Sequence, residues 1–481
     1  MSYIRGWDRG QVQLLPASVE EYVPADAPVR AIDAFVSGLK MKELGFEETP
    51  AETGRPGYDP AELLKLYCYG YLYRVRSSRR LEAETHRNLE LIWLLRGLRP
   101  DHWTIAAFRR EHRTRFRAVL REFNLLCRKL ELFGAELVAI DGAKFKAVNS
   151  PRRHYTADQL RELVGQIDSR IEEYLTQLDR ADTEQEGAPG RASAEELSGK
   201  LAKLLDRSAR AEQLREVLAA TGGSELSLTD PDSRGQKKVG VGYNVQVAVD
   251  GKHDLIVASE VVQAQNDQGQ LHAMAAAAKQ ELAVEQLTAV ADAGYHAATE
   301  LEKCEDAKIE TYVPARQSTA GRSTDGASVY PKTDFTYEPL RDVYRCPADR
   351  ELPFVCTAKD RDQLRRYYYD LAACAGCPLK SQCTKAAYRR ISRLPNEAVV
   401  ARQAARVAAR PDLVRERKTI VEHVFGTLRL WGHDKFLCRG MEKVQAEFTL
   451  SALAYNLRRA LNIKGTAALL AQLARNQPAP A

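Results

Sequence analysis

The stretch RERKTIVEHVFGTLR, residues 415–429, decides how the rest of the chain is interpreted. At about 3.6 residues per helical turn, four of its charged side chains return to within about 40° of one face: Arg415, Lys418, Glu422 and Arg429. The apolar side chains take other faces, where they can pack: Ile420, Val421, Val424 and Leu428. One carboxylate among three cations suits a site that holds a metal ion beside phosphates. It equally suits a solvated row of surface salt bridges, so the helix alone does not decide between the two interpretations.

The composition is that of a globular protein, since 44% of the 481 residues are hydrophobic and 28% are charged. This length accommodates about two to four domains. The formal net charge is only +6, but residues 74–117 hold twelve arginines against five acidic residues. The chain has no run of about 18 apolar residues and no apolar signal core near its start, so we expect a cytoplasmic protein. There, its nine cysteines would be thiols or metal ligands rather than disulfides.

The first 130 residues are predicted to form a helical, DNA-binding domain. Apolar side chains at helical spacing predict helices at 28–44 and 60–72, and Ser77, Ser78 and Asp101 are placed to cap further helices. Short helices with tight turns and many arginines are typical of helix-turn-helix-like domains, although they also fit a plain solvated bundle. The cations expected to contact DNA are Arg79, Arg80, Arg109, Arg110 and Arg113.

A first isolated carboxylate follows a short apolar run. Residues 136–140 are β-prone, and Asp141-Gly142 ends the predicted strand. An aspartate in such a position is often only a turn residue or a helix cap. Here Lys144, Lys146 and Asn149 follow at once, so the acid has a basic, polar neighbourhood, and Lys144 and Lys146 are candidate DNA contacts.

A helical insertion follows this strand. Two runs of leucine and isoleucine at steps of three and four, separated by a loop at 186–190, predict an antiparallel helical hairpin within residues 151–225. Apolar stripes at this spacing form core seams rather than sites. The same seam would also serve as a dimer contact.

The middle of the chain alternates strands and helices, and its last strand but one ends at Asp292-Ala293-Gly294-Tyr295. The predicted elements are strands at 242–250 and 255–262, a helix at 268–282, a strand at 287–291, a helix from 297 and a strand at 309–313. Functional groups collect where strands end at one edge of an α/β sheet. We therefore expect Asp141 and Asp292 to meet Glu422 there.

Three carboxylates at close range raise one another's pKa values and need cations to stay ionised. Two Mg²⁺ or Mn²⁺ ions about 4 Å apart would meet that need and support phosphoryl transfer. Carboxylate oxygens are the hard ligands that Mg²⁺ prefers.

Four stretches carry a family resemblance: AIDG at 139–142, GYNVQ at 242–246, ADAGY at 291–295 and VEHVFG at 421–426. Arg439-Gly440 and YNLRR at 455–459 add to it. In order and spacing these motifs resemble the DDE transposases of bacterial insertion sequences. Within that family they are most similar to the large subgroup with a Tyr-x2-Arg-x3-Glu-x6-Lys signature on the glutamate helix. The likeness runs from about residue 28 to about residue 465.

The resemblance implies an α/β fold with an RNase H-like catalytic core, a mixed sheet with flanking helices. It implies Asp141, Asp292 and Glu422 as catalytic residues that bind two Mg²⁺ or Mn²⁺ ions, and strand cleavage plus joining at terminal inverted repeats. The partners would be repeat DNA and target DNA, with a homodimer pairing the two ends. The setting would be the bacterial cytoplasm, on the nucleoid when the protein is bound to DNA.

The glutamate helix departs from that signature in three places. The aligned residues are Arg415, Lys418, Glu422 and Arg429, so the tyrosine is absent and the lysine and arginine are exchanged. Positive charge is kept, so phosphate binding by Arg415, Lys418 and Arg429 is still expected. A lysine does not reproduce the bidentate geometry of an arginine, so the individual strand contacts differ.

Five of the nine cysteines fall within residues 346–383. The Cys374-x2-Cys377 step suits tetrahedral Zn²⁺, with Cys346 and Cys383 completing four thiolates. Cys356 is an equally good fourth ligand, and free buried thiols are the alternative to a metal site. Basic residues surround the cluster, which suits DNA contact.

The predicted organisation is therefore as follows: a helical DNA-end-binding domain at 1–130, the first catalytic strand at 131–150, the helical hairpin at 151–225, more of the core at 226–316, a Cys-rich insertion at 317–400, the Glu422 helix with C-terminal helices at 401–465, and a tail at 466–481. The predicted function is DNA transposition. The alternatives are a metal-dependent nuclease of the same fold that does not join strands, and a decayed or repurposed sequence-specific DNA-binding protein.

Overall fold

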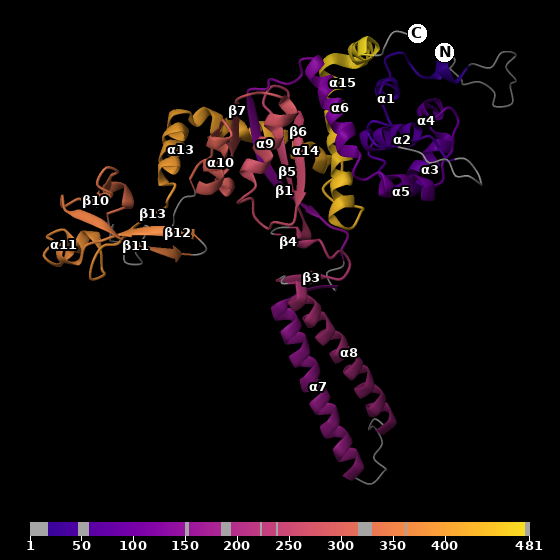
Figure 1. Ribbon diagram of the computed structural model, residues 1–481. Helices are drawn as coiled ribbons and strands as arrows, with labels where there is room; N and C mark the ends of the chain where they lie inside the picture. The colour runs from indigo at the N-terminus through magenta and orange to yellow at the C-terminus, as the bar shows by residue number, and fades with distance from the viewer. Residues whose placement is uncertain are drawn as a thin grey trace, which may run out of the picture.

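The computed structural model describes residues 18–46, 57–149, 153–183, 194–221, 224–236, 239–315, 330–360 and 363–476. Within these ranges the chain is a mixed α/β structure, as predicted. A central sheet lies beside a group of N-terminal helices, and a long helical pair and a small second sheet project from it (Figure 1). The loop predicted at 186–190 lies outside the described residues.

The central sheet has the strand order β4-β5-β1-β7-β8, with β6 also paired to β5. β1 is antiparallel to β5 and parallel to β7, and β7 is parallel to β8, so the sheet is mixed as expected. The strands are β1 (Leu137–Lys146), β4 (Arg234–Gln236), β5 (Gly240–Asp250), β6 (Ile256–Val262), β7 (Leu287–Ala291) and β8 (Ile309–Tyr312). The predicted hairpin, the two later strands and the helix between them are confirmed within a few residues.

The first strand is longer than the sequence predicts. Asp141-Gly142 does not end it, because Gly142 pairs with Gln246 and pairing with β5 continues as far as Lys146. A long partner strand thus overrides the local turn signal, as tertiary context often does for strands. Asp141 consequently lies inside β1 rather than at its end.

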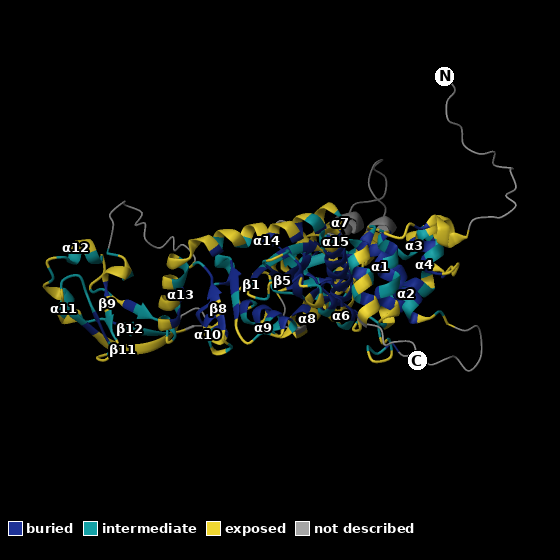
Figure 2. Cartoon of the chain, turned by 90° about the horizontal axis from the view of Figure 1, so that it is seen from above, coloured by how far each residue is buried: buried dark blue, intermediate teal, exposed yellow. Residues whose placement is uncertain are grey.

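Helices cover both faces of the sheet. α14 (Pro411–Leu430) packs Ile420, Val421, Val424 and Phe425 inward, and the Phe425 ring lies 6.3 Å from that of Phe145 on β1. α13 (Glu397–Ala409) precedes it. α9 (Leu271–Leu282) and α10 (Ala298–Asp306) lie on the opposite face. Figure 2 shows that the outer side of α14 is exposed along most of its length.

The N-terminal helices form one core with the C-terminal helix α15 (Met441–Asn476), which packs against α1, α2, α6 and β6. Asn456 of α15 accepts a hydrogen bond from the backbone N–H of Ile256 at 2.8 Å and so covers strand β6. The N-terminal elements are η1 (Val19–Tyr22), α1 (Pro28–Ser37), α2 (Pro60–Leu72), α3 (Ser78–Arg87), α4 (Leu89–Leu94), α5 (His102–Glu111) and α6 (Phe116–Lys129). The helix predicted at 28–44 ends early, at Ser37 before Gly38.

A buried ion pair ties these helices to the sheet domain. Arg76 Nη1 lies 3.1 Å from Glu447 Oε1, and the Glu447 side chain is fully buried. The same carboxylate accepts the backbone N–H groups of Leu437 and Cys438. Breaking such a pair from one side leaves a buried charge without compensation. Part of the arginine excess at 74–117 is therefore structural.

The sequence analysis predicted a tail at residues 466–481. The structure instead continues α15 through this segment as far as residue 476. Leu469 and Leu473 are buried, so this segment has its own apolar face. The helix bends at Gly465, whose φ of 78° favours glycine.

The helical hairpin consists of α7 (Ala157–Thr183) and α8 (Ala194–Thr221). In the described part of the hairpin, Val164, Ile167 and Ala211 are buried between the helices. Strands β2 (His154–Thr156) and β3 (Glu225–Ser227) pair antiparallel at its base, from which it projects away from the core (Figure 1).

The cysteine-rich segment contains a second sheet that the sequence analysis did not predict, of order β13-β12-β11-β10-β9. A small core of Phe335, Tyr344, Leu352, Tyr368 and Ile391 holds it. The elements are η4 (Lys332–Asp334), β9 (Thr336–Glu338), β10 (Val343–Arg345), β11 (Glu351–Asp360), β12 (Gln363–Tyr368), α11 (Leu371–Ala375), α12 (Lys380–Cys383) and β13 (Ile391–Arg393). Much of β11 is exposed, so it lacks the alternation that identifies strands from sequence.

Gly242→Ala is expected to destabilise the fold by roughly 3 kcal/mol or more. A Cβ at this position would lie against the backbone carbonyl oxygen of Phe145 on β1, which cannot move without disturbing the sheet. Gly426→Ala on α14 is the matched control, because a Cβ there meets nothing within 4 Å and alanine favours a helix by about 1 kcal/mol. Denaturant unfolding followed by circular dichroism measures both, and equal stability of the two variants would contradict the packing described for Gly242.

Candidate active site

Asp141 and Asp292 lie side by side on neighbouring strands. β1 and β7 are parallel with Ile140 opposite Ala291, and each aspartate is the next residue along the chain. Burial raises the pKa of Asp141, the Arg417 guanidinium opposes that rise, and the Asp292 charge adds to it. Asp292 Oδ1 accepts the backbone N–H of Gly294 at 2.7 Å, which caps the short helix η3 (Ala293–Tyr295). The predicted meeting of these two acids is therefore observed.

Arg417 is a site residue that the sequence analysis missed. Its Nη1 lies 3.0 Å from Asp141 Oδ2, and only 11% of its side chain is exposed. It occupies the inner face of α14, in line with Val421 and Val424, which are also buried. A helical wheel centred on the apolar side chains rather than on Glu422 would have placed it there.

Glu422 stands on the other side of α14. It follows Arg417 by five residues, or about 140° around the helix, and it is exposed. Arg415, Lys418 and Arg429 are exposed too, so the four charged residues do share an outer face. Among the described residues, Glu422 does not converge with the two aspartates on a point where the three could hold a metal ion. The structure thus brings two of the three predicted carboxylates together and leaves the third apart.

A second polar cluster lies directly beside the aspartates, on the α9 side of the sheet. Asp267 Oδ1 accepts from Asn244 Nδ2 and Gln246 Nε2, both at 2.8 Å, and from Lys144 Nζ at 3.3 Å. The buried Tyr295 hydroxyl donates to Gln246 Oε1. Sequence analysis singled out the motifs that contain Asn244, Gln246 and Tyr295 but not Asp267, whose only signal was its place in a polar run after β6.

The two adjacent aspartates fit a divalent cation, since they offer hard oxygen ligands next to each other. The two carboxylates also repel each other, and Arg417 supplies positive charge to Asp141. A bound cation would reduce the remaining repulsion. In the ranges that the structure describes, no three His, Cys, Asp or Glu side chains converge closely enough to hold a metal ion. A complete ligand set therefore requires a further group, from Glu422 or from the phosphate of bound DNA.

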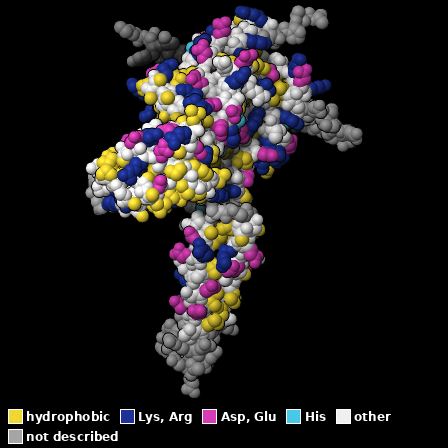
Figure 3. All heavy atoms as spheres, turned by 60° about the vertical axis from the view of Figure 1, so that its left-hand side comes forward, with side chains coloured by type: hydrophobic (Ala, Val, Ile, Leu, Met, Phe, Trp, Pro, Cys, Tyr) yellow, Lys and Arg dark blue, Asp and Glu magenta, His cyan; other side chains and the backbone are white. Residues whose placement is uncertain are grey.

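The predicted DNA contacts fall into two groups. The exposed group is Arg79 and Arg80 on α3, Lys146 on β1, and Arg415, Lys418 and Arg429 on α14. The others have partners in the protein: Arg109 packs its largely buried guanidinium over the Tyr67 ring, Arg110 pairs with Glu111, Arg113 with Glu442, and Lys144 with Asp267. Figure 3 shows basic and acidic side chains intermingled over the face that it presents, without one continuous basic stripe.

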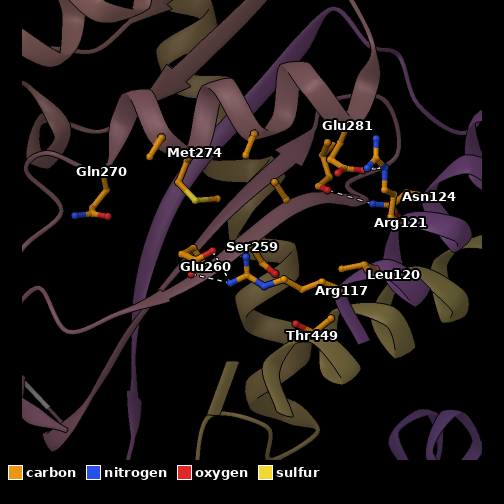
Figure 4. Close-up of a pocket in the computed structure, with 14 residues that line it drawn as sticks. Arg117, Leu120, Arg121, Asn124, Ser259, Glu260, Gln270, Met274, Glu281 and Thr449 are labelled. Atoms are coloured by element: carbon orange, nitrogen blue, oxygen red, sulfur yellow. Dashed lines mark hydrogen bonds and ion pairs between the residues drawn. The ribbon is translucent and has the colours of Figure 1, made fainter. Parts of the chain in front are cut away.

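A pocket of about 280 Å³ lies between α6, β6, α9 and α15, away from the aspartates (Figure 4). Its charged side chains neutralise one another, with Arg117 2.7 Å from Glu260 and Arg121 3.7 Å from Glu281. No reactive group in it is left to act on a substrate, so it is not a candidate active site.

The four cysteines predicted as zinc ligands line one small cavity of about 20 Å³: Cys346, Cys374, Cys377 and Cys383. Burial raises the pKa of the Cys383 thiol, and the charges of the other three cysteines raise it further. Cys356, the alternative ligand, is exposed on β11 and does not line the cavity. These thiols share a location but, like the carboxylates, do not converge on one point.

Two family models match the chain at its ends. Residues 17–111 match a transposase domain (DUF772), and residues 345–461 match a transposase DDE domain. Both segments are therefore similar to transposase domains, and the C-terminal one is of the DDE type. The first match covers most of the N-terminal helices, and the second includes the cysteine-rich segment and the Glu422 helix but stops short of Asp141 and Asp292. A transposase domain implies a DNA partner, and a DDE domain implies an RNase H-like core and divalent metal ions.

No curated protein matches the chain at a significant level. Among solved structures, a cryo-EM structure of the piggyBac transposase synaptic complex with hairpin DNA is similar over 94% of this chain and 86% of that one, at 8% identity and a TM-score of 0.25. So weak a likeness carries no argument. Across the described part of the chain, every helix is too short or too polar to cross a membrane.

Proposed function

We propose that this protein is a DDE transposase that binds the terminal inverted repeats of an insertion sequence and cleaves and joins DNA strands there with two divalent cations. The observation that carries the proposal is that Asp141 and Asp292 directly follow Ile140 and Ala291, which lie opposite each other on β1 and β7, in a chain whose C-terminal part matches a DDE domain. Adjacent carboxylates of this kind mark metal-dependent phosphoryl transfer rather than DNA binding alone. Within the DDE type, we assign the chain to the Tyr-Arg-Glu-Lys subgroup on the order of its motifs.

Each group has a distinct task in this proposal. Asp141 and Asp292 hold the metal ions, and Glu422 is the third carboxylate. When bound, Mg²⁺ would supply activation of water and stabilisation of the oxygen that leaves the phosphodiester. The protein itself supplies placement, because the register of β1 and β7 fixes the two aspartates relative to each other. The exposed cations of α14 contact DNA phosphates: Arg415, Lys418 and Arg429.

The N-terminal helices are proposed to hold the DNA ends through their exposed arginines, Arg79 and Arg80 above all, with Arg110 and Arg113 exchanging carboxylate partners for phosphate. Two ends must be paired before joining, so we propose a homodimer on DNA. The setting is the bacterial cytoplasm, at the nucleoid.

The test is incubation of the full-length protein with DNA that carries the repeats flanking its gene, with and without Mn²⁺, scoring both cut and joined strands. We expect metal-dependent cuts at the repeat ends together with joined product. Cuts without joined product would identify a nuclease of the same fold. Specific binding without any cut would identify a repurposed DNA-binding protein, and either result would overturn the proposal.

We also propose that Cys346, Cys374, Cys377 and Cys383 bind one structural Zn²⁺, because they line one cavity and Cys374-x2-Cys377 suits tetrahedral coordination. Protein purified without chelator is expected to contain about one zinc per chain by elemental analysis. The Cys377→Ser variant should lose the metal, and the segment that contains the second sheet should unfold at a lower temperature. Cys356→Ser, the exposed control, should retain it, and wild-type protein free of zinc would refute the assignment.

A further inference from the structure

We propose that Asp267 is a positioning residue for the two aspartates, an inference that rests on the proposed function. Asp267 lies in the connection between β6 and α9, and 22% of its side chain is exposed. Its carboxylate joins the strand that carries Asp141, the neighbouring strand β5, and the turn that follows Asp292. It thereby fixes the two candidate metal ligands relative to each other without holding the metal itself.

The first support is the convergence of three donors on one oxygen. Asn244 and Gln246 come from β5 and Lys144 from β1, and all three point their nitrogens at Asp267 Oδ1. Hydrogen bonds to an ionised acceptor are about twice as strong as neutral ones. An amide in place of the carboxylate would accept these bonds more weakly and turn an N–H₂ group toward donors.

The second support is close packing against the glycines that follow both aspartates. A Cβ on Gly142 would lie 2.5 Å from Asp267 Oδ1, and a Cβ on Gly294 would lie 3.8 Å from its Oδ2. Gly142 is the residue after Asp141, and Gly294 is the second residue after Asp292. The carboxylate therefore rests on the backbone of both segments, and the absence of a side chain at 142 is what admits it.

The third support is that Gln246, one of the three donors to Asp267, is itself held in place by a hydrogen bond. The Tyr295 hydroxyl donates to Gln246 Oε1, so the amide of Gln246 must present its N–H₂ group to Asp267. Tyr295 is fully buried and belongs to η3, directly after Asp292. A hydrogen-bonded path thus leads from the Asp292 turn through β5 to Asp267.

The position of Asp267 argues against direct metal binding. Side chains alternate along β1, so Asp141 and Phe145 face α14, whereas Gly142 and Lys144 face the other side with Asn244 and Gln246. Asp267 belongs to this second side, and its Oδ1 is already occupied by three donors. Residues that hydrogen-bond to metal ligands without touching the metal hold those ligands in place. Removing such a residue typically lowers metal affinity or activity by about 10–100-fold.

The test is Asp267→Asn in full-length protein with repeat-end DNA. We expect cleavage at saturating DNA to slow by about 10–100-fold and the affinity for Mn²⁺, measured by electron paramagnetic resonance, to weaken by about tenfold. The DNA dissociation constant should not change. Asp306→Asn, an exposed acid at the end of α10, is the matched control and should behave as wild type.

Tyr295→Phe tests the same path with a variant that keeps its shape. It should weaken Mn²⁺ binding in the same direction by a smaller factor, and combined with Asp267→Asn the two effects should be less than additive in free energy. If both variants lower the melting temperature but leave Mn²⁺ affinity unchanged, the positioning role is overturned. If wild-type protein itself neither binds Mn²⁺ nor cuts, the proposed function has failed instead.

Discussion

Asp141→Asn and Asp292→Asn are each expected to slow strand cleavage by about a thousandfold or more, while repeat DNA is still bound. An amide keeps the size of the side chain but supplies one neutral oxygen where a divalent cation needs a charged ligand. DNA binding should survive because the exposed arginines of α3 and the cations of α14 are untouched. Gel assays of end cleavage in Mg²⁺, with the dissociation constant of the same DNA, measure the two quantities together.

The Asp141 variant carries a second expected result. Burial and the neighbouring carboxylate already disfavour the charged form of Asp141, so a neutral amide should not destabilise the fold on that account. It does leave Arg417 without its carboxylate partner. Asp168→Asn, an exposed acid on α7, is the control for the substitution itself. Rapid cutting by either active-site variant would show that the metal site lies elsewhere.

The central fold could be predicted because its strands carry strong local signals. The alternation of β5 and β6 around Gly251 and the apolar run of β7 follow from side-chain periodicity alone. The extension of β1 beyond Asp141 could not be seen, since it depends on the partner strand β5. The second sheet escaped prediction because its strands are short and much of β11 is exposed.

The site was predictable to the same degree. The proximity of Asp141 to Asp292 was predicted from two strand ends meeting at one edge of a sheet, and it holds although Asp141 lies inside β1, because β1 and β7 are parallel neighbours. Asp267 could not be found, because its three donors come from strands far from it in sequence. For Glu422 the helical wheel correctly grouped four charges, but which face of α14 turns to the sheet is decided by Ile420, Val421, Val424 and Leu428. Those apolar residues carry Arg417 inward and leave Glu422 outside.

Glu422→Gln is expected to lower cleavage by about a hundredfold or more without affecting the stability of the fold. The side chain is exposed and, within the described residues, makes no hydrogen bond or ion pair, so its removal should change unfolding free energy by less than about 0.5 kcal/mol. A large loss of activity with no loss of stability is the mark of a residue that acts only when DNA and metal are bound.

Glu416→Gln is the matched control for this variant, because Glu416 is also an exposed glutamate on α14. It lies about 120° away from Glu422 around the helix and should retain full cleavage. Mn²⁺ affinity of the DNA complex should fall for Glu422→Gln alone. If both variants cut at the wild-type rate, Glu422 is part of an ordinary charged surface, and the third ligand must come from the inner side of α14 or from DNA. If Glu422→Gln alone loses cleavage, α14 must turn or shift when DNA binds, since its outer face cannot reach Asp141 while Arg417 occupies the inner one.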